Sequence, residues 1–465
     1  TGDKNNFSLV SWIEREEVME TDTRLRALNR FGLGARPGER TTIDPSSWLS
    51  AQVRADAALL TGSHLPTTAA SVEELTAARG DGQQSREQRQ AMRQLGRQRL
   101  GDEIRTALRH AAVTDTPFAE RMVRFWSNHF AVSVQGEALV SHVAGAYERE
   151  AIRPHVFGRF EDMVLATAMH PAMLVYLDQA RSIGPKSRAG KRNGRGLNEN
   201  YARELMELHT LGVDGGYTQD DVRQLALMLT GWTVGGMIRG RNSGESRPFQ
   251  FTDRLHEPGS KTLLRRRFAE AGVEEGRQAI SMLCQHPSTA TFIATKLVRH
   301  FVADQPHPMD VDFIARTFQR SNGDLRVVSL ALLQLDSAFH GPERKFRTPQ
   351  EFVIAAARAL GITTFDRKAV QALQSMRHTP WSPPSPAGYG DTVVDWAYPD
   401  SLLRRADLAQ MMSAMLGRKG VNITDLLSDT MELSNPAALV DLLKQQPTPQ
   451  LQLALFVASP DFQWR

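Results

Sequence analysis

Residues 197–212 decide the fold class, and they read Leu-Asn-Glu-Asn-Tyr-Ala-Arg-Glu-Leu-Met-Glu-Leu-His-Thr-Leu-Gly. At helical spacing, four polar residues share one face because they stand at i, i+3, i+4 and i+7: Asn200, Arg203, Glu204 and Glu207. An apolar stripe runs beside them: Tyr201, Leu205, Leu208 and Leu211. Gly212 is a typical C-terminal stop. We therefore predict a helix whose polar face is as ordered as its apolar face.

A second helix is predicted directly after the first, across a short Gly-rich loop. Thr218 and Asp221 form a variant of the capping box, with Asp in the position usually held by Glu or Gln. The apolar run that follows ends at Gly231, and Trp232 comes next. The segment thus predicts two adjacent helices, which is the basis for an all-α fold.

Several segments together resemble one bacterial family, DUF1800, whose name stands for a domain of unknown function. The matching segments are Asn29–Gly34, Phe125–Phe130, His170–Asp178, Asn198–Glu204, Leu229–Thr233 and Arg347–Phe352. They occur in the family's order from about Leu25 to the C-terminus. The resemblance implies an exported bacterial protein, often encoded beside a sulfatase-like partner. It implies no catalytic residue.

Composition describes an ordinary globular chain. Its 465 residues are 41% apolar, with a mean hydropathy of −0.37, and this length favours two or three helical subdomains. No run approaches the roughly 18 apolar residues of a membrane span. Cys284 is the only cysteine, so no intrachain disulfide can form. The chain starts at Thr1 without a signal-like segment, so we expect any export signal to have been removed.

Charge excludes one class of partner and marks one loop. The net charge of +4 comes from 56 basic and 52 acidic residues, a balance that does not indicate a nucleic-acid binder. One Gly-, Ser- and Pro-containing stretch is locally basic, with Arg181, Lys186, Arg188, Lys191, Arg192 and Arg195. It is either a solvated loop or a gate that attracts an anionic substrate to the neighbouring helix.

Helical periodicity covers most of the chain, and alternating β patterns are rare. We predict an all-α, multi-helix bundle of two packed helical subdomains, with long irregular loops and at most one small hairpin, which would involve Arg247–Thr252. The predicted regions are an N-terminal helical region (1–115), a central core with the polar helix (116–345) and a C-terminal region with a Pro/Trp loop (346–465).

Two long irregular segments interrupt the helices, Val234–Leu263 and Gln374–Ala397. Loops of this length inside a compact domain are usually functional or disordered. The second contains Trp381 within a Pro-rich run, which suits either stacking against a sugar ring or a surface strap that packs its own tryptophans. The first contains His256, which resembles the family's His-containing loop but has Arg-Leu inserted before the histidine.

The leading functional hypothesis is an exported hydrolase, periplasmic or secreted, that acts on a polysaccharide. Two carboxylates one helical turn apart are about 5–6 Å apart at Cβ, and in a cleft their repulsion would raise one pKa, as acid/base catalysis requires. The predicted catalytic residues are Glu204, Glu207 and Asp178. The predicted substrate-binding residues are Asn128, His129, Trp126, His170, Asn200, Arg203, Trp232, His256 and Trp381.

Two alternatives remain open from the sequence. A metal or redox protein would use His129, His170 and His256 with Glu204, although no His-Glu metal motif occurs and no cofactor is predicted. A non-enzymatic scaffold for an exported partner or polymer would use the polar helix face as a buried structural network.

The hydrolase hypothesis makes a geometric prediction. The helices at Arg121–Phe130, Pro171–Asp178, Asn198–Leu211 and Asp220–Thr230 need mutual burial of their apolar faces. We expect them to form a central bundle with one cleft that holds Asn128, Asp178, Asn200, Glu204 and Glu207. Glu204 should be largely buried, with an Arg, Asn or His partner.

Overall fold

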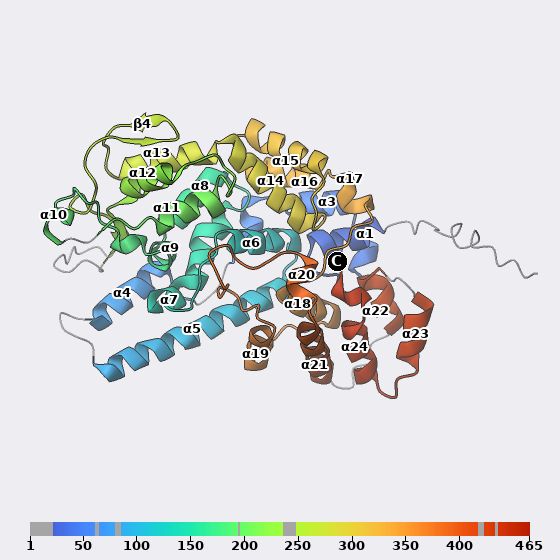
Figure 1. Ribbon diagram of the computed structural model, residues 1–465. Helices are drawn as coiled ribbons and strands as arrows, with labels where there is room; N and C mark the ends of the chain where they lie inside the picture. Colours follow the sequence, from blue (N-terminus) through green and yellow to red (C-terminus); the bar gives the residue numbers. More distant parts are fainter. Residues whose placement is uncertain are drawn as a thin grey trace, which may run out of the picture.

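The structure is a computed structural model, and it describes residues 22–60, 65–79, 85–193, 196–235, 248–416, 423–432 and 436–465. Helices dominate these ranges, and 63% of the described residues are helical, which confirms the all-α class (Figure 1). Arg195 of the basic loop and Arg247 of the predicted hairpin lie outside the described residues.

The N-terminal region consists of short helices followed by one long helix. They are α1 (Thr23–Arg26), α2 (Glu39–Thr42), α3 (Pro45–Ser50), α4 (Thr68–Arg79) and α5 (Arg86–Val113), with a π-helical turn at Ala27–Phe31 and a 3-10 turn at Ala55–Ala58. The long helix begins at a capping box in which Ser85 and Gln88 satisfy each other's backbone N–H groups.

The central region carries the helices that the sequence marked as unusual. They are α6 (Pro117–His129), α7 (Ala138–Tyr147), α8 (Phe160–Ala168), α9 (Pro171–Tyr176), α10 (Gly190–Asn193), α11 (Asn200–Glu204) and α12 (Gln219–Leu229). A π-helical turn at Glu148–Ile152 and 3-10 turns at Arg153–His155 and Gln179–Arg181 connect some of them. The capping box at Thr218 and Asp221 starts α12 as predicted.

The predicted helix at 198–211 is present but irregular. It runs as α11 and continues as a π-helical turn, Leu205–His209, before the left-handed Gly212. A π-turn adds one residue to the helical circuit. Side chains after Glu204 are therefore rotated away from the positions that a regular helix would give them.

Two small antiparallel sheets, rather than at most one hairpin, interrupt the helices. Strand β1 (Trp232–Val234) pairs with β2 (Phe249–Phe251), and β3 (Lys261–Leu263) pairs with β4 (Arg266–Phe268). The second pair turns at Leu264 and Arg265, both with positive φ, as a tight two-residue hairpin requires. These two residues are not the Gly or Asn typical of such a turn, which is why the sequence did not mark it.

The C-terminal half returns to helices. They are α13 (Val273–Cys284), α14 (Pro287–Phe301), α15 (Pro308–Arg320), α16 (Leu325–Leu332), α17 (Asp336–His340), α18 (Pro349–Leu360), α19 (Arg367–Ser375), α20 (Val393–Trp396), α21 (Pro399–Met415), α22 (Ile423–Thr430), α23 (Pro436–Lys444) and α24 (Pro449–Ala458), with a 3-10 turn at Asp461–Gln463. Among the described residues, no helix has the length and apolar character that crossing a membrane requires.

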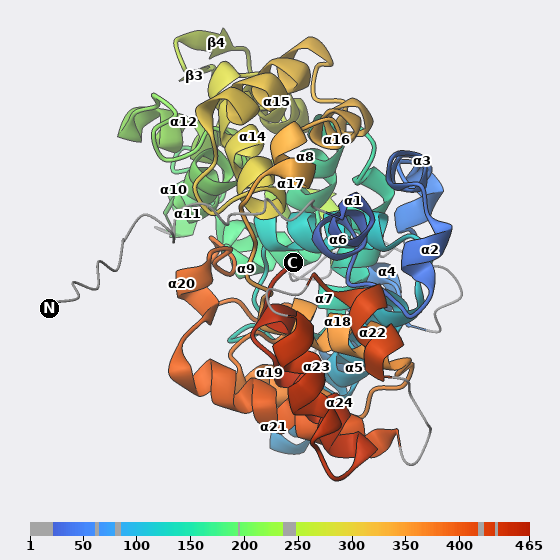
Figure 2. The same ribbon diagram turned by 90° about the vertical axis from the view of Figure 1, so that its right-hand side faces the viewer.

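Two large hydrophobic cores correspond to two packed groups of helices. One core joins residues from Ala27 to Ala338, and the other joins α5 with α18, α21 and α24. Figures 1 and 2 show α13–α17 on one side of α6 and α18–α24 on the other, with the C-terminus between them. Because α5 packs into the C-terminal core, the cores do not follow chain order. The predicted region boundaries stay a prediction.

Candidate functional site

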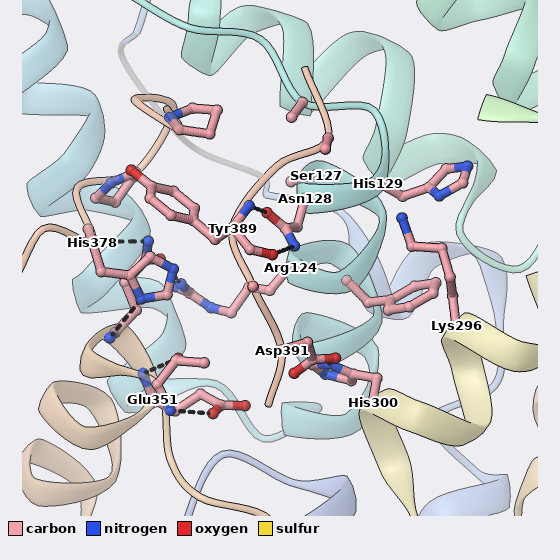
Figure 3. A pocket seen from close by; sticks show the side chains of 18 of the residues that line it. Arg124, Ser127, Asn128, His129, Lys296, His300, Glu351, His378, Tyr389 and Asp391 are labelled. Atoms are coloured by element: carbon pink, nitrogen blue, oxygen red, sulfur yellow. Dashed lines mark hydrogen bonds and ion pairs between the residues drawn. The ribbon is translucent and has the colours of Figure 1, made fainter. Parts of the chain in front are cut away.

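A cavity of about 420 Å³ lies where α6 and α14 meet the first turn of α18 and the segment 378–395. Figure 3 shows this central cavity. Its volume lies within the roughly 300–1,000 Å³ of small-molecule sites, and apolar walls with a few polar groups are typical of them. The apolar wall includes Phe125, Leu208, Phe292 and Trp381. The polar wall includes Arg124, Asn128, His129, Lys296, Arg299, His300, Tyr389 and Asp391.

The segment 378–395 is held in place by Asn128. The Asn128 amide donates to the Tyr389 carbonyl at 3.0 Å and accepts from the Tyr389 N–H at 2.7 Å. Gly388 has a φ of +83°, and a Cβ there would lie 2.4 Å from the Asn128 carbonyl oxygen. The Asn128 side chain, predicted to bind substrate, lines the cavity, and its amide is occupied by positioning this segment.

Trp381 also lines the cavity, so the Pro/Trp segment forms part of the cavity wall. Its carbonyl accepts from the Val134 N–H at 2.9 Å, and its φ of +54° is left-handed. The indole is 9% exposed. Such strained residues persist where the surrounding structure holds them, often at functional sites.

His300 and Asp391 form a hydrogen-bonded pair in the cavity wall. The His300 Nδ1 lies 2.7 Å from the Asp391 Oδ2, and the Nε2 is shielded from solvent with no partner among the described residues. Burial lowers the pKa of His300, against the opposing effect of Asp391. Burial raises the pKa of Asp391 and the neighbouring His300 lowers it, and the net shift is downward. The pair is therefore a neutral imidazole that donates from Nδ1 to an ionised carboxylate.

Lys296 stands one helical turn before His300 and is half-buried. In the described part of the chain it has no hydrogen bond or ion pair, only a cation–π contact with Phe292 at 5.6 Å. Burial lowers its pKa to about 8, with nearby Asp391 opposing the shift and nearby Arg299 adding to it. Figure 3 shows its amino group directed toward the side of the cavity where His129 lies.

His129, predicted as a substrate or metal ligand, is buried in the cavity wall beside His209. Its Nε2 donates to the His209 carbonyl at 3.2 Å, which leaves Nδ1 as an acceptor without a partner among the described residues. Burial, and next the charge of Lys296, lowers the pKa of His129 well below 6.5 and that of His209 to about 3. Both imidazoles are therefore neutral at neutral pH.

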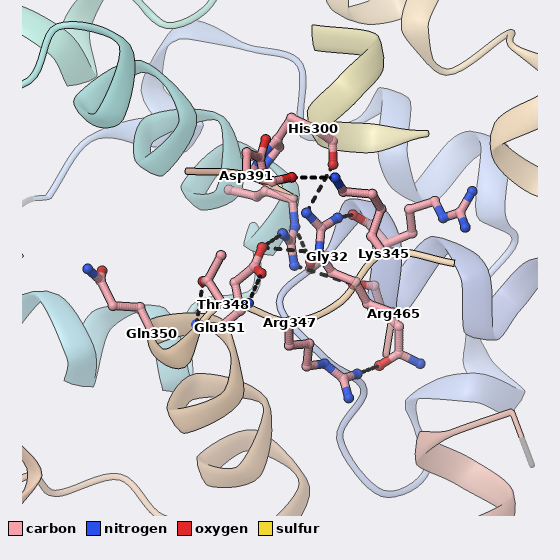
Figure 4. Close-up of polar contacts among 12 residues, drawn as sticks. Gly32, His300, Lys345, Arg347, Thr348, Gln350, Glu351, Asp391 and Arg465 are labelled. Atoms are coloured by element: carbon pink, nitrogen blue, oxygen red, sulfur yellow. Dashed lines mark hydrogen bonds and ion pairs between the residues drawn. The ribbon is translucent and has the colours of Figure 1, made fainter. Parts of the chain in front are cut away.

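The floor of the cavity is a buried ionic network around Glu351, shown in Figure 4. The Glu351 carboxylate accepts from the Thr348 N–H at 2.8 Å and from Arg121, and it forms an ion pair with Arg465, whose Nε lies 3.1 Å away. Arg121 also donates to the Gly32 carbonyl at 2.6 Å. Two of the segments that resemble the family, 29–34 and 347–352, therefore meet here for a structural reason.

The ion pairs of Glu351 make stability depend on pH. Burial raises the pKa of Glu351, but the charges of Arg465 and Arg121 lower it by a larger amount. The pKa of Glu351 in the folded protein therefore lies well below 4.5. Its charge therefore stabilises the fold above 4.5, and this contribution is lost as pH falls through the folded pKa. We expect the difference in unfolding free energy between wild type and Glu351→Gln to shrink as pH falls below 4.5, measured by urea denaturation. The exposed Glu274→Gln is the control, and a constant difference for Glu351→Gln would contradict the assignment.

The predicted catalytic carboxylates of the polar helix lie outside the lining of the central cavity. Glu204 and Glu207 are half-buried, and the Arg203 guanidinium pairs with Glu207 at 3.5 Å. Burial, and next the charge of Glu207, raises the pKa of Glu204, against the opposing effect of Arg203. Glu204 is thus less buried than expected, and among the described residues its predicted Arg partner pairs with Glu207 instead.

Asp178 and Asn200 are also outside the lining, so the predicted cleft that joins them to Asn128 is not formed by the central cavity. Asp178 has a φ of +58°, and its half-exposed carboxylate pairs with Arg181 at 3.4 Å. Asn200 is exposed at the start of α11, and Arg203 donates to Gln219 at 2.7 Å. The exposed start of α11 keeps Asn200 away from Asn128, and the Asp178 carboxylate pairs with Arg181 instead.

Two predicted stacking tryptophans belong to the hydrophobic core. Trp126 and Trp232 are both 0% exposed. The Trp126 ring contacts Phe125 and Phe130, and the Trp232 ring contacts Phe249 edge-on at 5.4 Å. They pack inside the fold and present no face to a substrate.

Two predicted histidine ligands serve structural contacts. The His170 Nδ1 accepts from the Ala172 N–H at 3.1 Å and so caps α9, the capping role that a histidine before Pro171 suggests. The His256 Nδ1 lies 2.8 Å from the Thr230 carbonyl, and its Nε2 lies 3.1 Å from Glu275. Within the described ranges, His, Cys, Asp and Glu side chains nowhere gather in threes around a point that would hold a metal ion.

The fold and this site define an all-α protein with a central cavity that carries unpaired nitrogen groups. The family model of DUF1800, described as a protein of unknown function, matches residues 26–464. The chain therefore belongs to the DUF1800 family, as the resemblance implied. Neither the curated proteins nor the solved structures contain a match to this chain.

Sequence reasoning missed Lys296, His300 and Asp391. The first two lie at i and i+4 in the segment that forms α14, so a polar face could be recognised in an otherwise apolar helix. Asp391 lies 91 residues after His300. No local pattern links it to His300, and only tertiary packing brings the two together.

Proposed function

We propose that this protein is a hydrolase whose active site is the central cavity, with His300 as the general base. The observation that carries the proposal is the His300–Asp391 pair at 2.7 Å, in which the free Nε2 bears the lone pair. A carboxylate that accepts from one ring nitrogen holds the imidazole in the tautomer that can take a proton at the other. Asp391 acts as the positioning residue.

The proposed reaction is hydrolysis of an ester or another acyl bond. The free protein shields the His300 Nε2 from solvent, so the proposed step requires that the substrate-bound cavity admit one water to this nitrogen. Nε2 then takes a proton from that water while the water oxygen bonds to the carbonyl carbon. The bond to the leaving group then breaks, and the imidazolium returns the proton to the leaving oxygen. The Lys296 ammonium, which lacks an ion-pair partner among the described residues, is suited to hold a negatively charged group of the substrate in the cavity.

A second candidate, the glycoside hydrolase expected from the sequence, is favoured by one observation. The pKa of Glu204 is raised by burial and by Glu207, as a general acid requires. In this case the reaction would occur at the α11 face, and the central cavity would be separate from it.

Three further expectations from the sequence stay predictions: a polysaccharide substrate, a periplasmic or secreted location, and a sulfatase-like partner. Cell fractionation would test the location, and co-purification of the native protein would test the partner.

The two candidates differ in the residue on which activity depends. The full chain is assayed with para-nitrophenyl acetate and butyrate, and with para-nitrophenyl glucoside and glucuronide. We expect ester hydrolysis, and His300→Gln should lower kcat/KM by about 100-fold or more, the usual contribution of a general base. Asp391→Asn should also move the acidic limb of the pH profile, which a purely structural role would not do.

The surface pair His340 and Asp336 provides matched controls, because both side chains are more than half exposed at 56% and 90%. His340→Gln and Asp336→Asn should leave the rate unchanged. Glycoside hydrolysis that is lost in Glu204→Gln and kept in His300→Gln would support the second candidate and overturn the first. No hydrolysis of any probe by the folded wild type would overturn both.

A further inference from the structure

Two cations on one face of α14 line the central cavity without an ion-pair partner among the described residues. Lys296 and Arg299 stand at i and i+3, and neither has an ion pair or hydrogen bond among the described residues. They are close enough that the charge of Arg299 lowers the pKa of Lys296. The cavity wall therefore holds two neighbouring positive charges that repel each other.

The carboxylates in the same wall have other partners, and none of them lies within ion-pair distance of Lys296 or Arg299. Asp391, ionised beside a neutral imidazole, acts on Lys296 from farther away and offsets the effect of burial on its pKa only in part. Glu351 is paired with Arg121 and Arg465, and Asp391 is paired with His300. The remaining two are also occupied, Glu148 by Arg153 and Asp395 by the Thr392 cap. A cation in a partly apolar wall loses hydration without compensation. A ligand anion would supply the missing interaction.

The neighbouring imidazole adds a second requirement for the ligand. His129 is 1% exposed, and its Nδ1 is an acceptor that no donor in the described chain satisfies. A buried acceptor without a donor destabilises the protein, because it has lost its hydration and gained no hydrogen bond. An anion alone cannot satisfy it, because an anionic oxygen is also an acceptor. A hydroxyl group on the ligand can.

We propose that the central cavity recognises a hydroxylated oxyanion, such as an acidic sugar. Its anionic group lies against Lys296 and Arg299, and one hydroxyl donates to the His129 Nδ1. Trp381, in the same wall, provides an apolar face for the carbon skeleton. This inference rests on the proposed function in taking the cavity as the active site, and it names the substrate class that the base His300 would meet there.

The first experiment measures binding rather than turnover. The full chain is titrated calorimetrically with glucuronate, phosphorylated glucose, glucose and cyclohexanecarboxylate. We expect glucuronate or phosphorylated glucose to bind about 10- to 100-fold more tightly than glucose, the usual effect of a charged hydrogen bond. Cyclohexanecarboxylate, which lacks the hydroxyls, should also bind more weakly than glucuronate. The first two ligands distinguish a carboxylate from a phosphate.

Variants of Lys296 test whether its positive charge binds the anion. Lys296→Met should lower the affinity for the preferred anion by about 10- to 100-fold, whereas Lys296→Arg should keep most of it because the charge remains. The exposed Lys368→Met is the matched control and should bind as wild type does. Equal affinity of wild type for glucose and for both anions, or unchanged anion affinity in folded Lys296→Met, would overturn the proposal.

A pH series on wild type keeps the test valid even if Lys296→Met fails to fold. The anion binds the protonated amine, and the pKa of Lys296 in the free protein is about 8. Affinity should therefore fall as pH rises above this value in wild type, and not in Lys296→Arg. Anion binding without hydrolysis would overturn only the hydrolase proposal. Hydrolysis with no preference for anions would overturn only this one.

Discussion

Replacing Arg153 by alanine is expected to lower the free energy of unfolding by about 3–5 kcal/mol. The Arg153 side chain is 0% exposed and donates to both oxygens of Glu120, at 2.7 and 3.1 Å. It also contacts Glu148 at 2.8 Å and donates to the Ala58 carbonyl at 2.9 Å. Without the guanidinium, two buried carboxylates lose their main counter-ion, and an uncompensated buried charge is costly.

Urea denaturation followed by circular dichroism measures this loss. The matched control is Arg277→Ala, because Arg277 is 42% exposed and pairs with the 49% exposed Glu274. An exposed pair contributes only about 0–1 kcal/mol. A similar small loss for Arg153→Ala would show that the network around Glu120 does not hold α6 in place.

Replacing Trp232 by alanine is expected to lower the free energy of unfolding by a similar amount, about 3–5 kcal/mol. Trp232 is fully buried, and a Cβ on Gly276 would lie 2.5 Å from its ring. The ring therefore fills the space between β1 and α13. Its removal leaves a cavity whose lining loses dispersion contacts as well as apolar burial.

Trp48→Ala provides the comparison, because Trp48 is only half-buried. Both variants are compared by thermal and urea unfolding, and Trp48→Ala should lose clearly less stability. If Trp232→Ala unfolds at the wild-type denaturant concentration, the indole does not pack in the core. In that case the sequence-based prediction that Trp232 stacks against a substrate would again be possible.

The local features of the fold could be predicted from the sequence because neighbouring residues determine them. The capping boxes at Thr218 and Thr348 start α12 and α18, and in each the residue three positions on accepts the reciprocal N–H. Gly212 ends the polar helix in the left-handed conformation, as predicted. The all-α class follows from such signals because apolar spacing and caps act within a few residues.

The candidate site could be predicted only in part. His129, Asn128 and Trp381 were recognised from unusual local segments, and all three line the central cavity. The carboxylates of residues 197–212 were equally prominent in the sequence, but none of them lines it. The π-turn, which no sequence signal specified, changes the register only after Glu204, so among these carboxylates it affects Glu207 alone. Tertiary packing decides which elements the rest of this face meets.

The sequence by itself determined the helices, their caps and the family, because each depends on residues close together in the chain or on an ordered set of segments. Only the tertiary structure decided which polar groups meet. It brings Asp391 to His300 across 91 residues, and it leaves Lys296 facing a cavity without an ion-pair partner among the described residues. Packing of the apolar faces sets these distances, and the loss of hydration in the cavity wall sets the pKa values.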